Sequence, residues 1–89
     1  MELSKRAKKD LHRAPRHIAH ALLAWIDAVA VEGLAAVRKI PGYHDEPLHG
    51  DRKGERSIRL SSKWRAIYVE VRSGEFEIAR VEEVTPHKY

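Results

Sequence analysis

Three consecutive strand-like runs in the second half of the sequence constrain the fold more than any other feature. They cover Arg56 to Leu60, Trp64 to Arg72 and Glu75 to Val84, and short polar turns separate them. Ser73-Gly74 suits a hairpin turn, so we expect antiparallel neighbours. The middle run is apolar on both faces, which indicates a place inside the sheet. A phase change between Ile78 and Val81 predicts a β-bulge.

Two helices are predicted before these strands. A short edge strand at Glu2 and Leu3 leaves Ser4 as the cap of a first helix over residues 5–13. Pro15 fits the first turn of a second helix, and the short connection predicts an antiparallel helical hairpin. Gly33 is suited to end the second helix, and residues 34–39 add one more helical turn. The apolar stripe of the second helix consists of Ile18, Leu22, Trp25, Ile26 and Val29.

These elements predict a single domain over residues 1–89. Their order is β-α-α-β-β-β, an α+β fold in which the N-terminal helical hairpin packs on one face of a small antiparallel sheet. The absence of cysteine excludes disulfides and cysteine-ligated zinc. The most apolar run, Ile18 to Val31, contains His20 and Asp27 and is too short to span a bilayer. We therefore expect a cytoplasmic protein without a membrane partner.

Positive charge is concentrated in two places. The net charge is +4, from 17 basic and 13 acidic residues. One basic cluster lies in residues 1–17, where an ordinary solvated helix face is an equal alternative to a binding surface. The second lies in the polar loop, the first strand-like run and the turn that follows this run. Its candidate contacts to an RNA backbone are Arg52, Lys53, Arg56 and Lys63, although an ordinary charged turn explains them nearly as well.

The first strand-like run suggests the location of a site. Ile58 and Leu60 alternate with Ser57 and Arg59, so the first pair faces the core while the second pair shares the open side. We hypothesise that this open side is an anion-binding groove for RNA. The alternation does not decide which face Arg65 occupies.

The sequence resembles the RelE/ParE superfamily of bacterial toxins, closest to its HigB and YoeB branch. The likeness covers nearly the whole chain and depends on the order of several short motifs. These motifs are Lys9-Asp10-Leu11, Glu46-Pro47-Leu48, Gly50, Gly54, Ser57-Ile58-Arg59-Leu60, Arg65-Ala66-Ile67-Tyr68 and His87-Lys88-Tyr89.

This resemblance implies a RelE/ParE-like fold and a toxin that cuts messenger RNA in the ribosomal A site. It also implies a cognate antitoxin, and a toxin–antitoxin heterotetramer on operator DNA. Carried over by position, Glu46 and His87 transfer protons, Arg59 and Arg65 bind the phosphate, and Tyr89 lies near the reacting nucleotide. The spacing His87-Lys88-Tyr89 departs from toxins in which His and Tyr are adjacent.

The implied chemistry needs no metal or other cofactor. A base removes the proton of a 2′-hydroxyl, an acid protonates the leaving 5′-oxygen, and cations stabilise the phosphate. The product is a 2′,3′-cyclic phosphate, and DNA is not cut. The six histidines include His17 and His20 at helical spacing and His44 and His49 in the loop. Neither pair has an obvious third ligand, which argues against zinc.

Each candidate residue also has a structural interpretation. Glu46 can be a turn residue before proline, His87 a surface histidine and Arg59 a surface charge. Trp64 and Tyr68 can be core residues or can stack on a base. Two other functions stay open: a ParE-like poison of DNA gyrase, which needs neither Glu46 nor His87, and a nucleic-acid-binding module without turnover.

Overall fold

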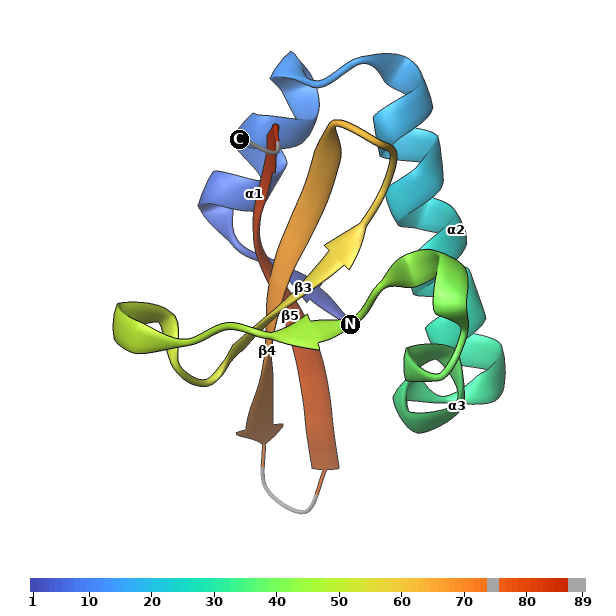
Figure 1. Cartoon of the computed structure of the whole chain (residues 1–89), viewed down its shortest axis with the longest axis vertical. Coiled ribbons are helices and arrows are strands. Elements are labelled where there is room, and N and C mark those ends of the chain that lie inside the picture. Colours follow the sequence, from blue (N-terminus) through green and yellow to red (C-terminus); the bar gives the residue numbers. More distant parts are fainter. Residues whose placement is uncertain (74–75, 87–89) are drawn as a thin grey trace.

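The computed structural model describes residues 1–73 and 76–86, which form three helices against a five-stranded sheet (Figure 1). The helices are α1 (Lys5–Arg13), α2 (Arg16–Glu32) and α3 (Leu34–Arg38). The strands are β1 (Glu2–Leu3), β2 (Glu46–Pro47), β3 (Glu55–Arg59), β4 (Trp64–Ser73) and β5 (Phe76–Pro86). Two short 3₁₀ turns, η1 (Pro41–Tyr43) and η2 (Gly50–Arg52), flank β2.

The sheet is mixed, which corrects the prediction of an antiparallel sheet. Its strand order is β1-β5-β4-β3-β2, and β1 runs parallel to β5 while the other neighbours are antiparallel. The connection from β1 to α1 explains this direction. The Ser4 amide donates to the Val81 carbonyl (2.9 Å) and the Ser4 hydroxyl to the Glu82 carbonyl (2.7 Å). These bonds hold β1 beside β5 as the chain enters α1.

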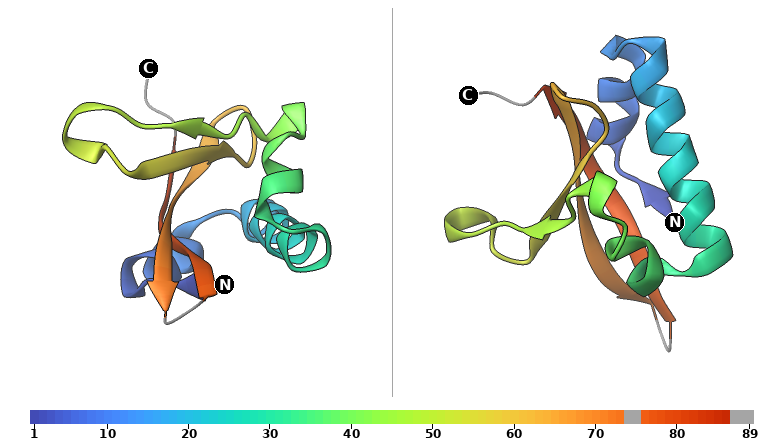
Figure 2. Two further views of the ribbon diagram at one scale, coloured as in Figure 1. Left: turned by 90° about the horizontal axis from the view of Figure 1, so that it is seen from below. Right: turned by 45° about the vertical axis from the view of Figure 1, so that its right-hand side comes forward.

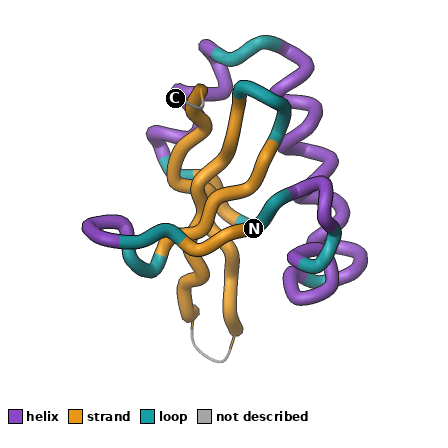
Figure 3. Tube along the Cα trace, viewed as in Figure 1, coloured by secondary structure: helices purple, strands orange, loops and turns teal. Residues whose placement is uncertain are grey.

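The two predicted helices form a hairpin on one side of the sheet (Figures 1 and 3). Ser4 caps α1 as expected, because its Oγ accepts a hydrogen bond from the Ala7 amide (3.0 Å). Pro15 is the residue before α2 rather than within its first turn. Gly33, at φ +85°, ends α2 and starts α3, in a backbone region that glycine adopts more readily than other residues. The additional turn predicted over residues 34–39 is therefore confirmed as α3.

The core lies between the helices and one face of the sheet (Figure 2). Trp25 of α2 and Tyr68 of β4 are both fully buried, and their ring centroids are 5.1 Å apart. The stripe of α2 supplies the helical side, with Ile18, Leu22 and Trp25 buried. None of the helices in the described part of the chain is long and apolar enough to cross a membrane.

The β-bulge lies further along β5 than predicted. Tyr68 pairs with Val81 but Ile67 pairs with Glu83, so Glu82 is the extra residue. The bulge returns Val84 to the core, and the Val84 amide donates to Asp10 of α1 (2.9 Å). The hairpin turn predicted at Ser73-Gly74 includes residue 74, which lies outside the described residues.

Two adjacent leucines of α2 test this packing. Leu22 is fully buried, whereas Leu23 is 54% exposed. We expect Leu22→Ala to lower the free energy of unfolding by about 2–5 kcal/mol, because it leaves a cavity in the core. Leu23→Ala, the matched control, should change it by less than about 0.5 kcal/mol. Urea denaturation measures both, and equal losses would contradict this orientation of α2.

Candidate functional site

The pairing of β3 with β4 decides which arginines share a face. Ile58 lies opposite Ala66, and both belong to the core under the helices. Neighbouring residues on a strand point to opposite faces, so Arg59 and Arg65 point away from that core. They also lie directly opposite each other in the ladder. The structure thus places Arg65 on the same face as Arg59.

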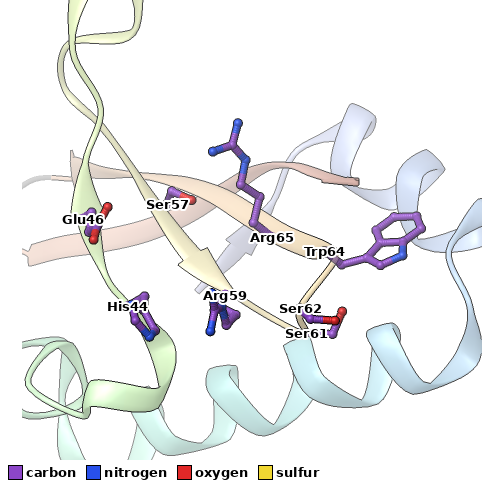
Figure 4. Close-up of a pocket in the computed structure, with 8 residues that line it drawn as sticks. All are labelled: His44, Glu46, Ser57, Arg59, Ser61, Ser62, Trp64 and Arg65. Carbon is purple, nitrogen blue, oxygen red and sulfur yellow. The ribbon is translucent and has the colours of Figure 1, made fainter. Parts of the chain in front are cut away.

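The short strand β2 brings a carboxylate to these arginines. Glu46 pairs with Ser57, and Ser57 lies two residues before Arg59 on the same face of β3. Glu46, Arg59 and Arg65 line one groove with a cavity volume of about 230 Å³ (Figure 4). The other residues that line this groove are His44, Ser57, Ser61, Ser62 and Trp64.

The charges of the groove are not neutralised within the described residues. Among the described residues, no partner forms an ion pair or a side-chain hydrogen bond with Arg59, Arg65 or Glu46. The Nε of Arg65 is buried and has no hydrogen-bond partner. Like charges directly opposite on paired strands repel, and a buried donor without an acceptor is unfavourable. An anion bound in the groove would relieve the repulsion between Arg59 and Arg65.

A buried aspartate anchors the segment that carries Glu46. The side chain of Asp45 is fully buried and accepts hydrogen bonds from Arg56 Nε (2.6 Å) and the Tyr68 hydroxyl (2.6 Å). The Nε of Arg38, on α3, lies 3.8 Å from the same carboxylate. Asp45 thus links α3, β3 and β4, and its network fixes the backbone immediately before Glu46.

Tyr68 has an altered acidity because of this network. Burial raises the pKa of Tyr68, and the hydrogen bond to Asp45 raises it further, to about 12. The Arg38 guanidinium, which donates to the Tyr68 oxygen (3.1 Å), acts in the opposite direction. The phenol therefore stays neutral and continues to donate its proton to Asp45 well above physiological pH.

A second network holds the loop after β2. Arg52 donates to Glu55 (2.9 Å) and to Glu83 of β5 (2.5 Å), whose side chain is only 9% exposed. The hydrogen bond to Glu55, followed by that to Glu83, raises the pKa of Arg52. The bond from Arg52 correspondingly lowers the pKa of Glu55. Arg52 therefore attaches the η2 turn to the sheet.

The site residues predicted from the sequence fall into three groups. Glu46, Arg59 and Arg65 come together in the groove. Of the four predicted RNA contacts, Arg52 and Arg56 are held by carboxylates, whereas Lys53 and Lys63 are exposed. His87 and Tyr89 lie outside the described residues.

Several residues that line the groove are not identified by the sequence pattern. From the sequence, His44 is a candidate metal ligand, and Ser61 and Ser62 belong to a turn; in the structure all three line the groove. The turn between β3 and β4 returns the chain beside Arg59, which is why these serines reach the groove. The positions of Ser61 and Ser62 follow from strand pairing, and no local pattern signals them. In the described part of the chain, no three His, Asp or Glu side chains are grouped to hold a metal ion.

Comparisons with known proteins identify the fold. No family model and no curated protein sequence matches the chain. Solved structures do match it. A YoeB/ParE toxin from Agrobacterium tumefaciens is 21% identical, with a TM-score of 0.69 over 99% of this chain and 100% of that one. The DinJ–YafQ toxin–antitoxin complex of E. coli matches at 24% identity and a TM-score of 0.72, over 97% of this chain and 89% of that one.

A third similar structure is the toxin–antitoxin complex RelBE2 from Mycobacterium tuberculosis. It is 21% identical, with a TM-score of 0.58 over 97% of this chain and 94% of that one. These matches span nearly all of each chain at low sequence identity. They establish a shared fold.

The Asp45 network yields a test of stability. Asp45→Asn removes a fully buried charge that Arg56 and Tyr68 contact directly. We expect the free energy of unfolding to fall by about 3 kcal/mol, because the partly buried Arg56 and Arg38 lose the buried charge that compensates them. Asp51→Asn, at an exposed aspartate in η2, should change it by less than about 0.5 kcal/mol. Similar effects of the two substitutions in urea denaturation would rule out this role for Asp45.

The raised pKa of Tyr68 predicts a dependence of stability on pH. The folded protein keeps the Tyr68 proton up to about pH 12, whereas the unfolded chain loses it near 10.0. The stabilisation is therefore complete below about pH 10 and is lost as the pH rises towards 12. The advantage of wild type over Tyr68→Phe should shrink by roughly 2 kcal/mol in this window. If the denaturation midpoints of wild type and Tyr68→Phe differed by the same amount throughout this pH range, the raised pKa of Tyr68 would be contradicted.

Proposed function

The chain has the RelE/ParE-like fold that its sequence predicts, and on this premise we propose that it is the toxin of a type II toxin–antitoxin pair. We further propose that it is an endoribonuclease that cuts messenger RNA on the ribosome. The shared fold supports the first statement, and the chemistry of the groove supports the second.

The observation that carries the nuclease proposal is the arrangement of Arg59, Arg65 and Glu46. Two arginines at directly paired strand positions line one groove without a carboxylate partner among the described residues, and the Glu46 carboxylate lines the same groove. Guanidinium groups bind phosphate oxygens through paired, charge-assisted hydrogen bonds. A phosphodiester held by both arginines would place its flanking sugar within the groove that Glu46 lines.

The proposed reaction is transfer of the phosphoryl group to the neighbouring 2′-oxygen. Glu46 takes the proton of the 2′-hydroxyl as the 2′-oxygen forms a bond to phosphorus. The bond from phosphorus to the 5′-oxygen breaks, and Arg59 and Arg65 stabilise the negative charge that the phosphate gains. The products are a 2′,3′-cyclic phosphate and a free 5′-hydroxyl.

The leaving 5′-oxygen must receive a proton, and the resemblance to YoeB-like toxins assigns this step to His87. Tyr89 is assigned a position near the reacting nucleotide by the same resemblance. Both residues lie outside the described part of the chain, and both roles stay predictions. Histidine suits the step because imidazole exchanges protons near neutral pH.

The flanking RNA is proposed to follow the basic residues around the groove. Lys53 and Lys63 are exposed and can contact phosphates without losing an ion pair within the described residues. Arg52 and Arg56 are engaged by carboxylates, so a phosphate contact from either would compete with those bonds. We therefore expect the two lysines to contribute more to RNA affinity than the two arginines.

The proposed partner is an antitoxin protein. Solved structures with this fold include toxin–antitoxin complexes, DinJ–YafQ and RelBE2. The uncompensated arginines make the groove attractive to an acidic side chain, so a segment of the antitoxin that presents one could occupy the place of the phosphate. The heterotetramer on operator DNA implied by the sequence resemblance belongs to the same proposal.

Induced expression with mapping of transcript 5′ ends tests the nuclease. Wild type should cut within translated frames and arrest growth. Arg59→Ala and Glu46→Gln should each reduce cleavage by about 100-fold or more, because each removes a group that acts in the transition state. His87→Gln tests the assigned acid in the same assay.

Lys39→Ala is the control for loss of a surface cation, since Lys39 is exposed, follows α3 and does not line the groove. It should cut and arrest growth like wild type. Growth arrest with intact transcripts, unchanged by Arg59→Ala and Glu46→Gln, would refute the nuclease and favour a ParE-like gyrase poison. Tight, salt-sensitive RNA binding without cleavage would favour a binding module.

A further inference from the structure

His44 has an unusual backbone conformation at the edge of the groove. Its φ of 45° and ψ of 49° lie in the left-handed region, and no other non-glycine residue among those described has a positive φ. The residue closes η1, where its amide donates to the Pro41 carbonyl (3.1 Å). Strained backbone at a side chain that lines a groove is a reason to look for a function.

The side chain of His44 is available to a ligand. It is exposed, and it forms no hydrogen bond or ion pair with the residues that the structure describes. It lines the groove together with Glu46, Arg59 and Arg65 (Figure 4). In the same view, His44 and Glu46 come from the segment on one side of the groove, and the arginines come from β3 and β4.

The position of His44 is also firmly held. The next residue, Asp45, has the buried carboxylate that Arg56 and Tyr68 contact. The backbone on the other side is closed by the η1 turn. The backbone at His44 is therefore fixed, so less entropy is lost on binding than for a residue of a mobile loop.

We propose that His44 is a third cationic contact of the groove and binds an RNA phosphate in its protonated form. This rests on the proposed function, because it takes RNA as the ligand. The charged groups that line the groove with His44 are Glu46, Arg59 and Arg65. A bound phosphate favours the protonated imidazole, so RNA binding takes up a proton at His44.

The consequence is an RNA affinity that depends on pH in the range where imidazole titrates. Arginine and lysine contacts keep their charge throughout that range, so they contribute affinity without this dependence. Tighter binding below neutrality that requires His44 is therefore specific to this proposal.

The test measures binding of an RNA oligonucleotide with 2′-O-methyl groups, which cannot be cleaved through the 2′-oxygen. Fluorescence anisotropy gives the Kd at about pH 5.5 and at about pH 8, either side of the imidazole range. Wild type should bind about fivefold more tightly at the lower pH. His44→Gln should bind the RNA weakly at both pH values, with Kd values that differ by less than about twofold. His44→Lys should bind the RNA tightly at both pH values.

His49→Gln is the matched control. His49 is an exposed histidine that follows β2 in the sequence, and it does not line the groove. This variant should show the same ratio of Kd values between the two pH values as wild type. The proposal would be overturned if His44→Gln kept this ratio, or if the Kd of wild type did not depend on pH. If unmodified RNA is bound in this pattern but never cut, the nuclease proposal fails while the role of His44 stands.

Discussion

The buried carboxylate of Asp45 is the interaction on which the groove depends. It is the acceptor for a guanidinium from β3 and a hydroxyl from β4, with a second guanidinium from α3 nearby. A buried charge is tolerated only when it is paired and hydrogen-bonded, so these partners must be in place when the protein is folded. The segment of β2 that lines the groove is thereby fixed to the sheet and to α3.

This arrangement separates arginines with structural roles from arginines with free charge. Arg38, Arg52 and Arg56 bind carboxylates and connect loops and helices to the sheet. Arg59 and Arg65 have no such partner among the described residues, although they lie in the same sheet. Within that part of the chain, no carboxylate neutralises the cationic groups of the groove. A binding site for a polyanion requires such a surplus of positive charge.

Much of the site followed from local patterns. The alternation in β3 placed Arg59 opposite the core face, whereas Glu46 was assigned to the site by the resemblance to RelE/ParE toxins. Arg65 was ambiguous because β4 is apolar on both faces, so periodicity alone carries no signal there. Arg56 looked like a free cation because its acceptor, Asp45, is distant along the chain. Arg52 has one acceptor three residues away, Glu55, but its attachment to the sheet depends on the distant Glu83. His44 carried no signal, since its backbone conformation depends on how η1 meets β2.

The sequence by itself determined the helices, four of the five strands, the α+β architecture and the helix ends at Ser4 and Gly33, because capping and hydrophobic periodicity act over a few residues. The two-residue strand β2 carries no such pattern, and the predicted order lacked it. Only the tertiary structure decided that β1 runs parallel to β5, that the bulge lies at Glu82 and that Arg65 faces Arg59. These features depend on strand register and on hydrogen bonds between distant residues, such as the bond from Val84 to Asp10. Register is set by the packing of whole faces, which a local pattern does not specify.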